Sequence, residues 1–331
     1  MTGEIKDGDK KILITGATGF IGRHLCDHLL NNGFLVRALV REASLTILEP
    51  NKNLEQLVGD LLDPTFLEKA CEDIDVIVHL AGLAHTHGST SSQLHKINID
   101  GTKLLLAAAD DKKVGRFVFM SSSLAAPANN RGLATTAYGK AKLSAEKLVM
   151  ARQERSKLES VVLRPVSVYG PGMRGNIALL ISLVLRRLAP PLPRLQTSLS
   201  LIGVEDVCDA VILVIMSRNA CGKIYTLTDG VHYMISDIEE AIYRQTGRNL
   251  PSWRIPLLLL YASCLGVESL RKFLSIFGFR IRLLDSVGMR TYNNLIEDNL
   301  FGNEDIREDL GFKPKTTFYK SLSKIVEGLD V

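Results

Sequence analysis

Two short segments of this chain combine residue types whose spacing could support redox chemistry. The first is the sequence TGATGFIG at 15–22, which follows the apolar run at 12–14. Glycines let backbone come close to a diphosphate, and the free N–H groups at the start of a following helix can bind it. The predicted dinucleotide contacts in this turn are Gly16, Thr18, Gly19, Phe20, Ile21 and Gly22.

The second segment is YGKAK at 138–142, which places a phenol and an ammonium group four residues apart. Tyr138 and Lys142 therefore share one face of the helix predicted at 137–154. A nearby ammonium lowers the pKa of a phenol and prepares it for proton transfer. Together the two segments predict a nicotinamide site with an acid/base group beside it.

The elements that must position these residues alternate along the first 170 positions. Short apolar runs predict strands at 12–15, 35–40, 54–58, 76–80, 117–120 and 161–163. Helical patterns lie between them, at 23–32, 65–71, 93–110 and 137–154. This alternation predicts an α/β fold with a Rossmann-like, doubly wound parallel sheet. We expect an NAD(P)-binding domain at 1–170 and a smaller C-terminal α/β substrate lobe at 171–331, partly interleaved with it.

Right-handed crossovers bring the carboxyl ends of parallel strands to one edge of the sheet, where the remaining candidates fall. The second strand ends at Arg41, where an NAD enzyme usually has an acidic residue for the ribose hydroxyl. A guanidinium suits a 2′-phosphate, so the sequence favours NADP(H). NAD(H) is the alternative, with Arg41 as a solvated loop residue and Glu42 as the ribose partner.

Three further strand ends supply candidates. Asp60 and Leu61 fit contacts to the adenine ring, with an isolated turn aspartate as the alternative. The small residues of Leu80-Ala81-Gly82 would let backbone pass close to the cofactor. A hydroxyl of Ser121-Ser122-Ser123 could donate to the substrate oxygen that changes oxidation state, and Asn98 could brace a helix or a water near the lysine.

The composition excludes several other classes of protein. The net charge of +4 is small, and no basic block suggests nucleic acid. The five cysteines form no CxxC pair, so we expect neither a metal site nor disulfides. We expect no secretion signal and no stable membrane span, and therefore a cytoplasmic protein. The apolar stretches at 177–185 and 255–267 are predicted to be buried helices, with docking on a membrane surface as the alternative.

Many motifs in order resemble the extended short-chain dehydrogenase/reductase family, over about 11–322. They are TGATGFIG, GDL at 59–61, HLAG at 79–82, INIDGT at 97–102, SSS at 121–123, YGKAK, RPVSVYGPG at 164–172 and LGFKPKTTF at 310–318.

The resemblance implies roles for individual residues. Tyr138 would be the acid/base and Lys142 its partner, with Ser122 as the catalytic hydroxyl and Ser121 beside it. Asn98 matches a structural asparagine of the family. Pro165 would lie by the nicotinamide, Asn176 would contact the substrate diphosphate, and weaker candidates for that contact are Arg174, Arg194 and Ser200. A homodimer formed through the helix at 137–154 is also expected.

Within the family, the chain looks most like enzymes of bacterial surface-polysaccharide synthesis that act on UDP-linked N-acetylhexosamines. This similarity implies a 4-keto-6-deoxy-sugar reductase, with a 4-epimerase that retains NAD as the alternative and a non-enzymatic dinucleotide sensor as a third. Dehydratases of the family place an Asp-Glu pair after the serines, whereas this chain has Leu124-Ala125. The segment between Ser122 and Tyr138 is also shorter than in most relatives.

Overall fold

The computed structural model describes residues 10–83, 90–126, 134, 136–188, 190–276 and 288–329. The chain divides into two compact units. Unit 1 comprises Met1–Val166, Val204–Asp229 and Gly302–Lys315, and unit 2 comprises Ser167–Gly203, Gly230–Phe301 and Thr316–Val331.

Unit 1 is built on a seven-stranded parallel sheet with the strand order β3-β2-β1-β4-β5-β6-β9. The strands are β1 (Lys11–Thr15), β2 (Leu35–Val40), β3 (Leu54–Val58), β4 (Val76–His79), β5 (Arg116–Met120), β6 (Glu159–Pro165) and β9 (Ile224–Leu227). The order reverses direction at β1, as in a doubly wound sheet, so the predicted Rossmann-like fold is confirmed.

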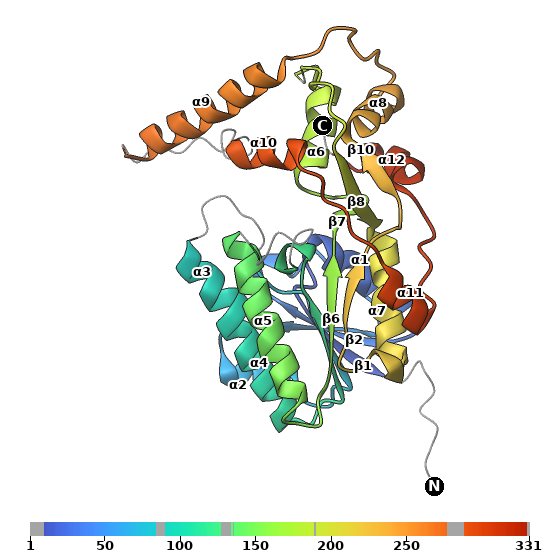
Figure 1. Cartoon of the computed structure of the whole chain (residues 1–331). Coiled ribbons are helices and arrows are strands. Elements are labelled where there is room, and N and C mark those ends of the chain that lie inside the picture. Colours follow the sequence, from blue (N-terminus) through green and yellow to red (C-terminus); the bar gives the residue numbers. More distant parts are fainter. Residues whose placement is uncertain are drawn as a thin grey trace. The chain divides into compact units, whose positions relative to one another are not determined.

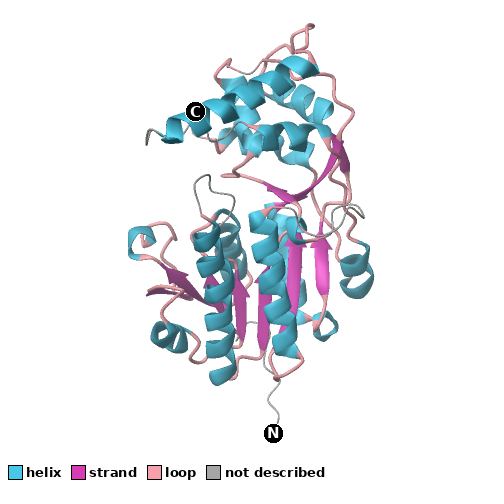
Figure 2. Cartoon of the chain, turned by 60° about the vertical axis from the view of Figure 1, so that its left-hand side comes forward, coloured by secondary structure: helices cyan, strands magenta, loops and turns pink. Residues whose placement is uncertain are grey.

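Helices cover both faces of this sheet (Figures 1 and 2), which explains why its central strands are continuous apolar runs. They are α1 (Phe20–Asn31), α2 (Pro64–Ala70), α3 (Ser91–His95), α4 (Gly101–Asp111), α5 (Ala137–Gln153), α7 (Val204–Met216) and α11 (Glu304–Leu310). Helices α2, α4 and α5 pack on one face, and α1 packs with α7 on the other. Three short 3₁₀ turns are η2 (Glu42–Ser44), η4 (Ser123–Ala125) and η5 (Arg218–Ala220).

The prediction of one helix at 93–110 is wrong, because the structure has three successive helical elements there. A π-helical turn, η3 (Lys96–Asp100), separates α3 from α4. Such turns add a residue to the helical repeat and often lie at functional sites. Here the turn contains the buried Asn98.

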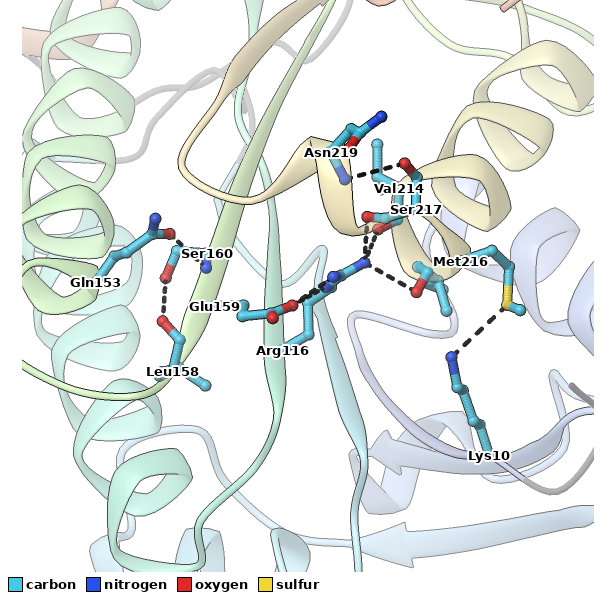
Figure 3. Close-up of polar contacts among 11 residues, drawn as sticks. Lys10, Arg116, Gln153, Leu158, Glu159, Ser160, Val214, Met216, Ser217 and Asn219 are labelled. Carbon is cyan, nitrogen blue, oxygen red and sulfur yellow. Dashed lines mark hydrogen bonds and ion pairs between the residues drawn. The ribbon is translucent and has the colours of Figure 1, made fainter. Parts of the chain in front are cut away.

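Arg116 ties the sheet to a helix end inside unit 1 (Figure 3). It is nearly fully buried, and its Nε donates to Glu159 of the neighbouring strand at 2.9 Å. Its Nη1 donates to the carbonyls of Ile215 at 2.9 Å and Ser217 at 2.8 Å, at the C-terminal end of α7. Because the last carbonyls of a helix lack intrahelical partners, this one guanidinium satisfies them.

Unit 2 has its own three-stranded sheet, in the order β10-β8-β7. Its strands are β7 (Ser167–Tyr169), β8 (Ser198–Gly203) and β10 (His232–Met234), and its helices are α6 (Asn176–Leu185), α8 (Ile235–Gln245), α9 (Leu257–Ile276), α10 (Met289–Ile296) and α12 (Phe318–Glu327). A buried aromatic cluster joins these layers, with the Tyr169 and Phe318 ring centroids 5.6 Å apart.

The two apolar stretches singled out in the sequence behave differently. In α6, Ala178, Ile181 and Val184 are buried, as predicted. The prediction that 255–267 is a buried helix is wrong, because Leu258 and Leu259 of α9 are 77% and 55% exposed. No helix within the described residues is both long and apolar enough to cross a bilayer.

Candidate active site

The glycine turn joins β1 to α1 with backbone packed too tightly for side chains. Gly16 has φ +75°, and a Cβ there would lie 2.7 Å from the amide nitrogen of Ala81. A Cβ on Gly22 would lie 2.2 Å from the carbonyl oxygen of Gly16. Gly19 begins α1 without a side-chain cap, so the first N–H groups of the helix have no side-chain acceptor there. Thr18, Phe20 and Ile21 are all partly exposed beside this turn.

The two arginines of β2 and its end differ in their surroundings. Arg37 is 8% exposed, and its guanidinium donates to Glu55 at 2.9 Å and to the Glu72 carbonyl at 2.7 Å. Arg37 is therefore part of the sheet packing. Arg41 is exposed at the start of η2, and its guanidinium has no hydrogen bond or ion pair with any residue in the described ranges.

Asp60 and Leu61 lie at the end of β3. Asp60 is exposed, and its Oδ1 accepts from the Leu62 amide at 2.9 Å. Asp60 therefore forms the turn interaction that the sequence offered as the alternative to an adenine contact. Its second carboxylate oxygen takes no part in this turn. The Leu61 side chain is buried against Gly101, so only its backbone could face a ligand.

The residues after β4 are held by a strand on one side and a helix turn on the other. The amides of Leu80 and Ala81 donate to the carbonyl and hydroxyl oxygens of Thr15 at 3.0 and 3.2 Å. The Asn98 side chain accepts from the Leu83 amide at 2.7 Å and donates to the Leu83 carbonyl at 3.0 Å. A Cβ on Gly82 would lie 3.0 Å from Asn98 Oδ1 and 3.4 Å from Lys142 Nζ. The predicted bracing role of Asn98 therefore has a geometric basis, and it places Gly82 beside the lysine.

His79 links these two supports through a hydrogen-bonded chain that the sequence did not suggest. The Thr102 hydroxyl donates to the Asn98 carbonyl at 2.8 Å, so its oxygen must accept from His79 Nε2 at 3.0 Å. His79 Nδ1 is then unprotonated and accepts from the Thr15 hydroxyl at 2.6 Å. Burial, with help from the Lys142 charge, lowers the pKa of His79 to about 3 and keeps the ring neutral.

The catalytic candidates lie at the start of α5, beside the end of β5. The Lys142 ammonium donates to the Met120 carbonyl at 2.8 Å and lies 4.7 Å from the centroid of the Phe119 ring. A Cβ on Gly139 would lie 2.2 Å from the carbonyl oxygen of Leu124, so the glycine between Tyr138 and Lys142 allows α5 to approach η4. This close packing sets the lysine next to the serines.

Burial dominates the acid/base properties of the pair. It raises the pKa of Tyr138 to about 12, so the prediction that the ammonium lowers this pKa is wrong. Burial also lowers the pKa of Lys142 to about 8, and the Glu146 carboxylate opposes that shift. Glu146 is itself held by Arg164 through bonds of 2.9 and 2.6 Å. The phenol is therefore kept protonated at neutral pH.

The two serines that follow β5 differ in the hydrogen bonds of their hydroxyls. Ser122 Oγ accepts from the Leu124 amide at 3.2 Å and caps η4, which leaves its hydroxyl hydrogen to donate elsewhere. Ser121 Oγ is buried and has no hydrogen-bond partner within the described ranges. A buried hydroxyl of this kind is costly unless a ligand group bonds to it.

The other predicted site residues fall in two places. Pro165 is buried at the end of β6 in unit 1. Asn176 and Arg174 are exposed near the start of α6 in unit 2. Ser200 is fully buried, and its hydroxyl donates to the Phe301 carbonyl at 3.2 Å while accepting from the Phe301 amide at 3.0 Å. The Ser200 hydroxyl thus serves the fold of unit 2.

These features fit a dinucleotide. The glycine turn presents backbone at a helix start, the Ser121 hydroxyl has no partner among the described residues, and Lys142 uses only one of its three N–H donors on a described residue. Sequence reasoning missed Gly139, Glu146, Arg164 and the His79 chain. Gly139 could have been identified from its place inside YGKAK. The roles of the others depend on how α5 and η3 pack, which the sequence does not show.

Comparison with known proteins finds one matching family model and several similar proteins. The family model described as "NAD dependent epimerase/dehydratase family" matches residues 12–227. The chain is 29% identical to a UDP-glucose 4-epimerase of Vibrio cholerae over 267 residues, which cover 75% of this chain and 79% of that protein. It is 32% identical to a ceramide reductase of Caulobacter vibrioides over 220 residues, which cover 66% of this chain and 64% of that protein.

A solved structure shows the same fold. The structure described as MoeE5 in complex with UDP-glucuronic acid and NAD has a TM-score of 0.75 and 23% sequence identity, and the match covers 96% of this chain and 98% of that chain.

Proposed function

Because the chain belongs to the NAD-dependent epimerase/dehydratase family, we propose that it reduces the C4 ketone of a UDP-linked 4-keto-6-deoxy-N-acetylhexosamine. One observation supports Tyr138 as the proton donor of this reaction. Tyr138 lies one helical turn before the buried Lys142, and burial raises its pKa to about 12, so the phenol is protonated at neutral pH. A protonated phenol can give its proton to the oxygen of a carbonyl that is being reduced.

The chain supplies binding and proton transfer in this scheme. A bound reduced nicotinamide supplies the hydride that goes to the carbonyl carbon. The Tyr138 hydroxyl gives its proton to the oxygen that becomes the alcohol, and the Ser122 hydroxyl donates a hydrogen bond to the same oxygen. The Lys142 ammonium stabilises the phenolate left on Tyr138 until solvent reprotonates it.

The cofactor of this proposal is NADP(H). Arg41 follows β2 as an exposed guanidinium without a partner among the described residues, and an acidic side chain does not take its place. A guanidinium there would bind a 2′-phosphate through charge-assisted hydrogen bonds. NAD(H) remains the alternative, with Glu42 as the ribose partner.

A 4-epimerase is the second candidate function. The relative named UDP-glucose 4-epimerase favours it, at 29% identity. In this scheme Tyr138 would take the proton of the C4 hydroxyl while a bound NAD⁺ would accept the hydride from C4. The same hydride would then return to the other face of the ketone, and Tyr138 would give its proton back to the oxygen.

Cofactor release separates the two candidates. We expect the purified protein, once denatured, to release little NAD(H), and the native protein to oxidise NADPH only when a UDP-4-keto-6-deoxy sugar is added. Stoichiometric NAD(H) in the supernatant, together with interconversion of UDP-GlcNAc and UDP-GalNAc without added cofactor, would establish the epimerase instead. NADPH oxidation with ceramide-like or steroid ketones and none with UDP sugars would reject both.

Three further assignments belong to the same proposal. Asn176 and Arg174 are proposed to bind the diphosphate of the substrate. The protein is proposed to act as a homodimer in the cytoplasm. Sedimentation velocity of the purified chain tests the dimer directly.

A further inference from the structure

Helix α9 of unit 2 exposes an apolar surface along much of its length. One side of the helix faces α10, where the Tyr261 and Tyr292 ring centroids lie 5.3 Å apart and Glu268 accepts from the Met289 amide at 3.3 Å. Cys264, between them on the same side, is 1% exposed. Positions 261, 264 and 268 therefore form the packed stripe of α9.

The side of α9 that adjoins this stripe has no charged residue between positions 258 and 270. Positions 258, 262, 265 and 269 recur at helical spacing, and 259, 266 and 270 form the adjacent row. The leucines at 258, 259, 265 and 270 are 77%, 55%, 44% and 47% exposed. Ala262, Gly266 and Ser269 are exposed between them. We call these seven residues the leucine face.

The leucine face is suited to an environment without water. A Cβ added to Gly266 would meet nothing within 4 Å, so the surface there is open. Ser263, at its border, donates its hydroxyl to the Leu259 carbonyl at 2.8 Å, which satisfies that hydroxyl within the helix. Contiguous exposed apolar surface of this kind marks an interaction site.

Charge indicates what covers the leucine face. Unit 2 has 14 Lys and Arg residues against nine Asp and Glu, whereas unit 1 has 26 against 27. In the sequence from Arg248 to Arg290, which includes α9, seven basic residues accompany two acidic ones. Of these, Arg248 donates to the Leu185 carbonyl and Arg254 pairs with Glu239. Two copies of unit 2 would repel each other at such a surface, whereas anionic headgroups would be attracted to it.

We propose that unit 2 docks on an anionic phospholipid bilayer, with α9 lying in the plane of the interface and the leucine face in the acyl-chain boundary. An uncharged helix face flanked by basic residues is typical of interfacial helices. Trp253, four residues before α9 and 60% exposed, is a residue type that prefers the headgroup level. The inference is independent of the sugar or ketone on which the enzyme acts.

The protein carries its own reporter for the test, because Trp253 is its only tryptophan. Full-length protein is titrated with phosphatidylcholine vesicles that contain either no anionic lipid or roughly one third phosphatidylglycerol. We expect a blue shift of the tryptophan emission, quenching by brominated acyl chains and co-flotation of the protein with the anionic vesicles. Raising the salt concentration should weaken the binding, because it screens the headgroup charge.

Two matched variants locate the contact. Leu258→Asp, on the leucine face, should weaken vesicle binding by about tenfold or more, since an anionic side chain replaces a buried apolar one. Leu188→Asp changes an equally exposed leucine of unit 2 (67%) that lies outside α9, and should bind nearly as well as the wild type. Circular dichroism and thermal melting check that both variants are folded.

Three results would overturn the proposal. The wild type could fail to shift its emission or to float with anionic vesicles. Leu258→Asp could bind as tightly as Leu188→Asp. The wild type could instead form a concentration-dependent dimer that Leu258→Asp abolishes, without vesicle binding, which would assign the leucine face to a second copy of the chain.

Discussion

The buried Lys142 leads us to predict how the unfolding free energy varies with pH, whatever the substrate is. The residue is 4% exposed, and burial lowers the pKa of its ammonium from 10.5 to about 8. At neutral pH the group is charged in the folded and the unfolded chain, so the depressed pKa corresponds to about 3 kcal/mol of lost stability. Above pH 8 the folded chain releases this proton while the unfolded chain keeps it up to about pH 10.5. Stability from this group therefore rises with pH in that window.

The variant Lys142→Met isolates the effect. It removes the ammonium and leaves the Met120 carbonyl without its 2.8 Å donor, at a cost of about 1–3 kcal/mol that does not vary with pH. Between pH 7 and about pH 9.5 the wild type should gain about 2 kcal/mol of unfolding free energy relative to Lys142→Met. Urea unfolding of both proteins at the two pH values measures this double difference, in which other titrating groups cancel.

The matched control is Lys140→Met, which removes an exposed lysine from the same helix. Its unfolding free energy should follow that of the wild type at both pH values. A difference between the wild type and Lys142→Met that stays constant within about 0.5 kcal/mol from pH 7 to 9.5 would refute the reasoning, because a buried ammonium must titrate in this range.

Three further predictions concern catalysis and the cofactor. Tyr138→Phe should lower kcat by roughly 10²- to 10⁴-fold while the dissociation constant of NADPH stays within about twofold; unchanged turnover in a steady-state assay would remove Tyr138 from the mechanism. Arg41→Asp should weaken NADPH binding by at least about tenfold and improve NADH relative to it, because a carboxylate repels the 2′-phosphate; calorimetric titration with both cofactors measures the ratio, and an unchanged ratio contradicts the role of Arg41. Gly22→Ala should destabilise the protein by about 1–3 kcal/mol and weaken cofactor binding, because its Cβ would lie 2.2 Å from the Gly16 carbonyl oxygen. The control is Gly266→Ala, whose new Cβ would have nothing within 4 Å and which should not lower the melting temperature.

The fold of unit 1 could be predicted because its sheet is buried on both faces. The predicted strands at 35–40 and 54–58 agree with β2 and β3, and those matching β1, β4 and β5 differ by one residue at one end. The strand predicted at 161–163 is two residues short of β6 at each end. Parallel strands under helices must be continuous apolar runs, and such runs are visible in a sequence. The π turn at Lys96–Asp100 was not predictable in this way, because one extra residue in a helix hardly changes the apolar period.

The site was predictable in its residue types and not in its electrostatics. Tyr138 and Lys142 follow from their spacing, but the directions of their pKa shifts depend on burial, which a sequence does not give. In unit 2, the hydrophobicity of a stretch likewise does not show whether it is buried. The stretch at 255–267 is apolar enough to be a core helix, yet only packing decides whether a partner covers it, and most of α9 has none within the described residues.

The buried polar groups around α5 explain why the site costs stability and what would restore it. Lys142 donates once, to the Met120 carbonyl, and its remaining N–H groups have no acceptor among the described residues. Ser121 Oγ is buried, and no residue in the described part of the chain bonds to it. Both groups would gain hydrogen bonds from a ligand that carries hydroxyls, so binding should raise the pKa of Lys142 back toward its ordinary value. The gain in stability of the wild type between pH 7 and 9.5 should therefore shrink when saturating NADPH is present. Retention of the full gain would show that bound NADPH gives the Lys142 ammonium no hydrogen-bond acceptor.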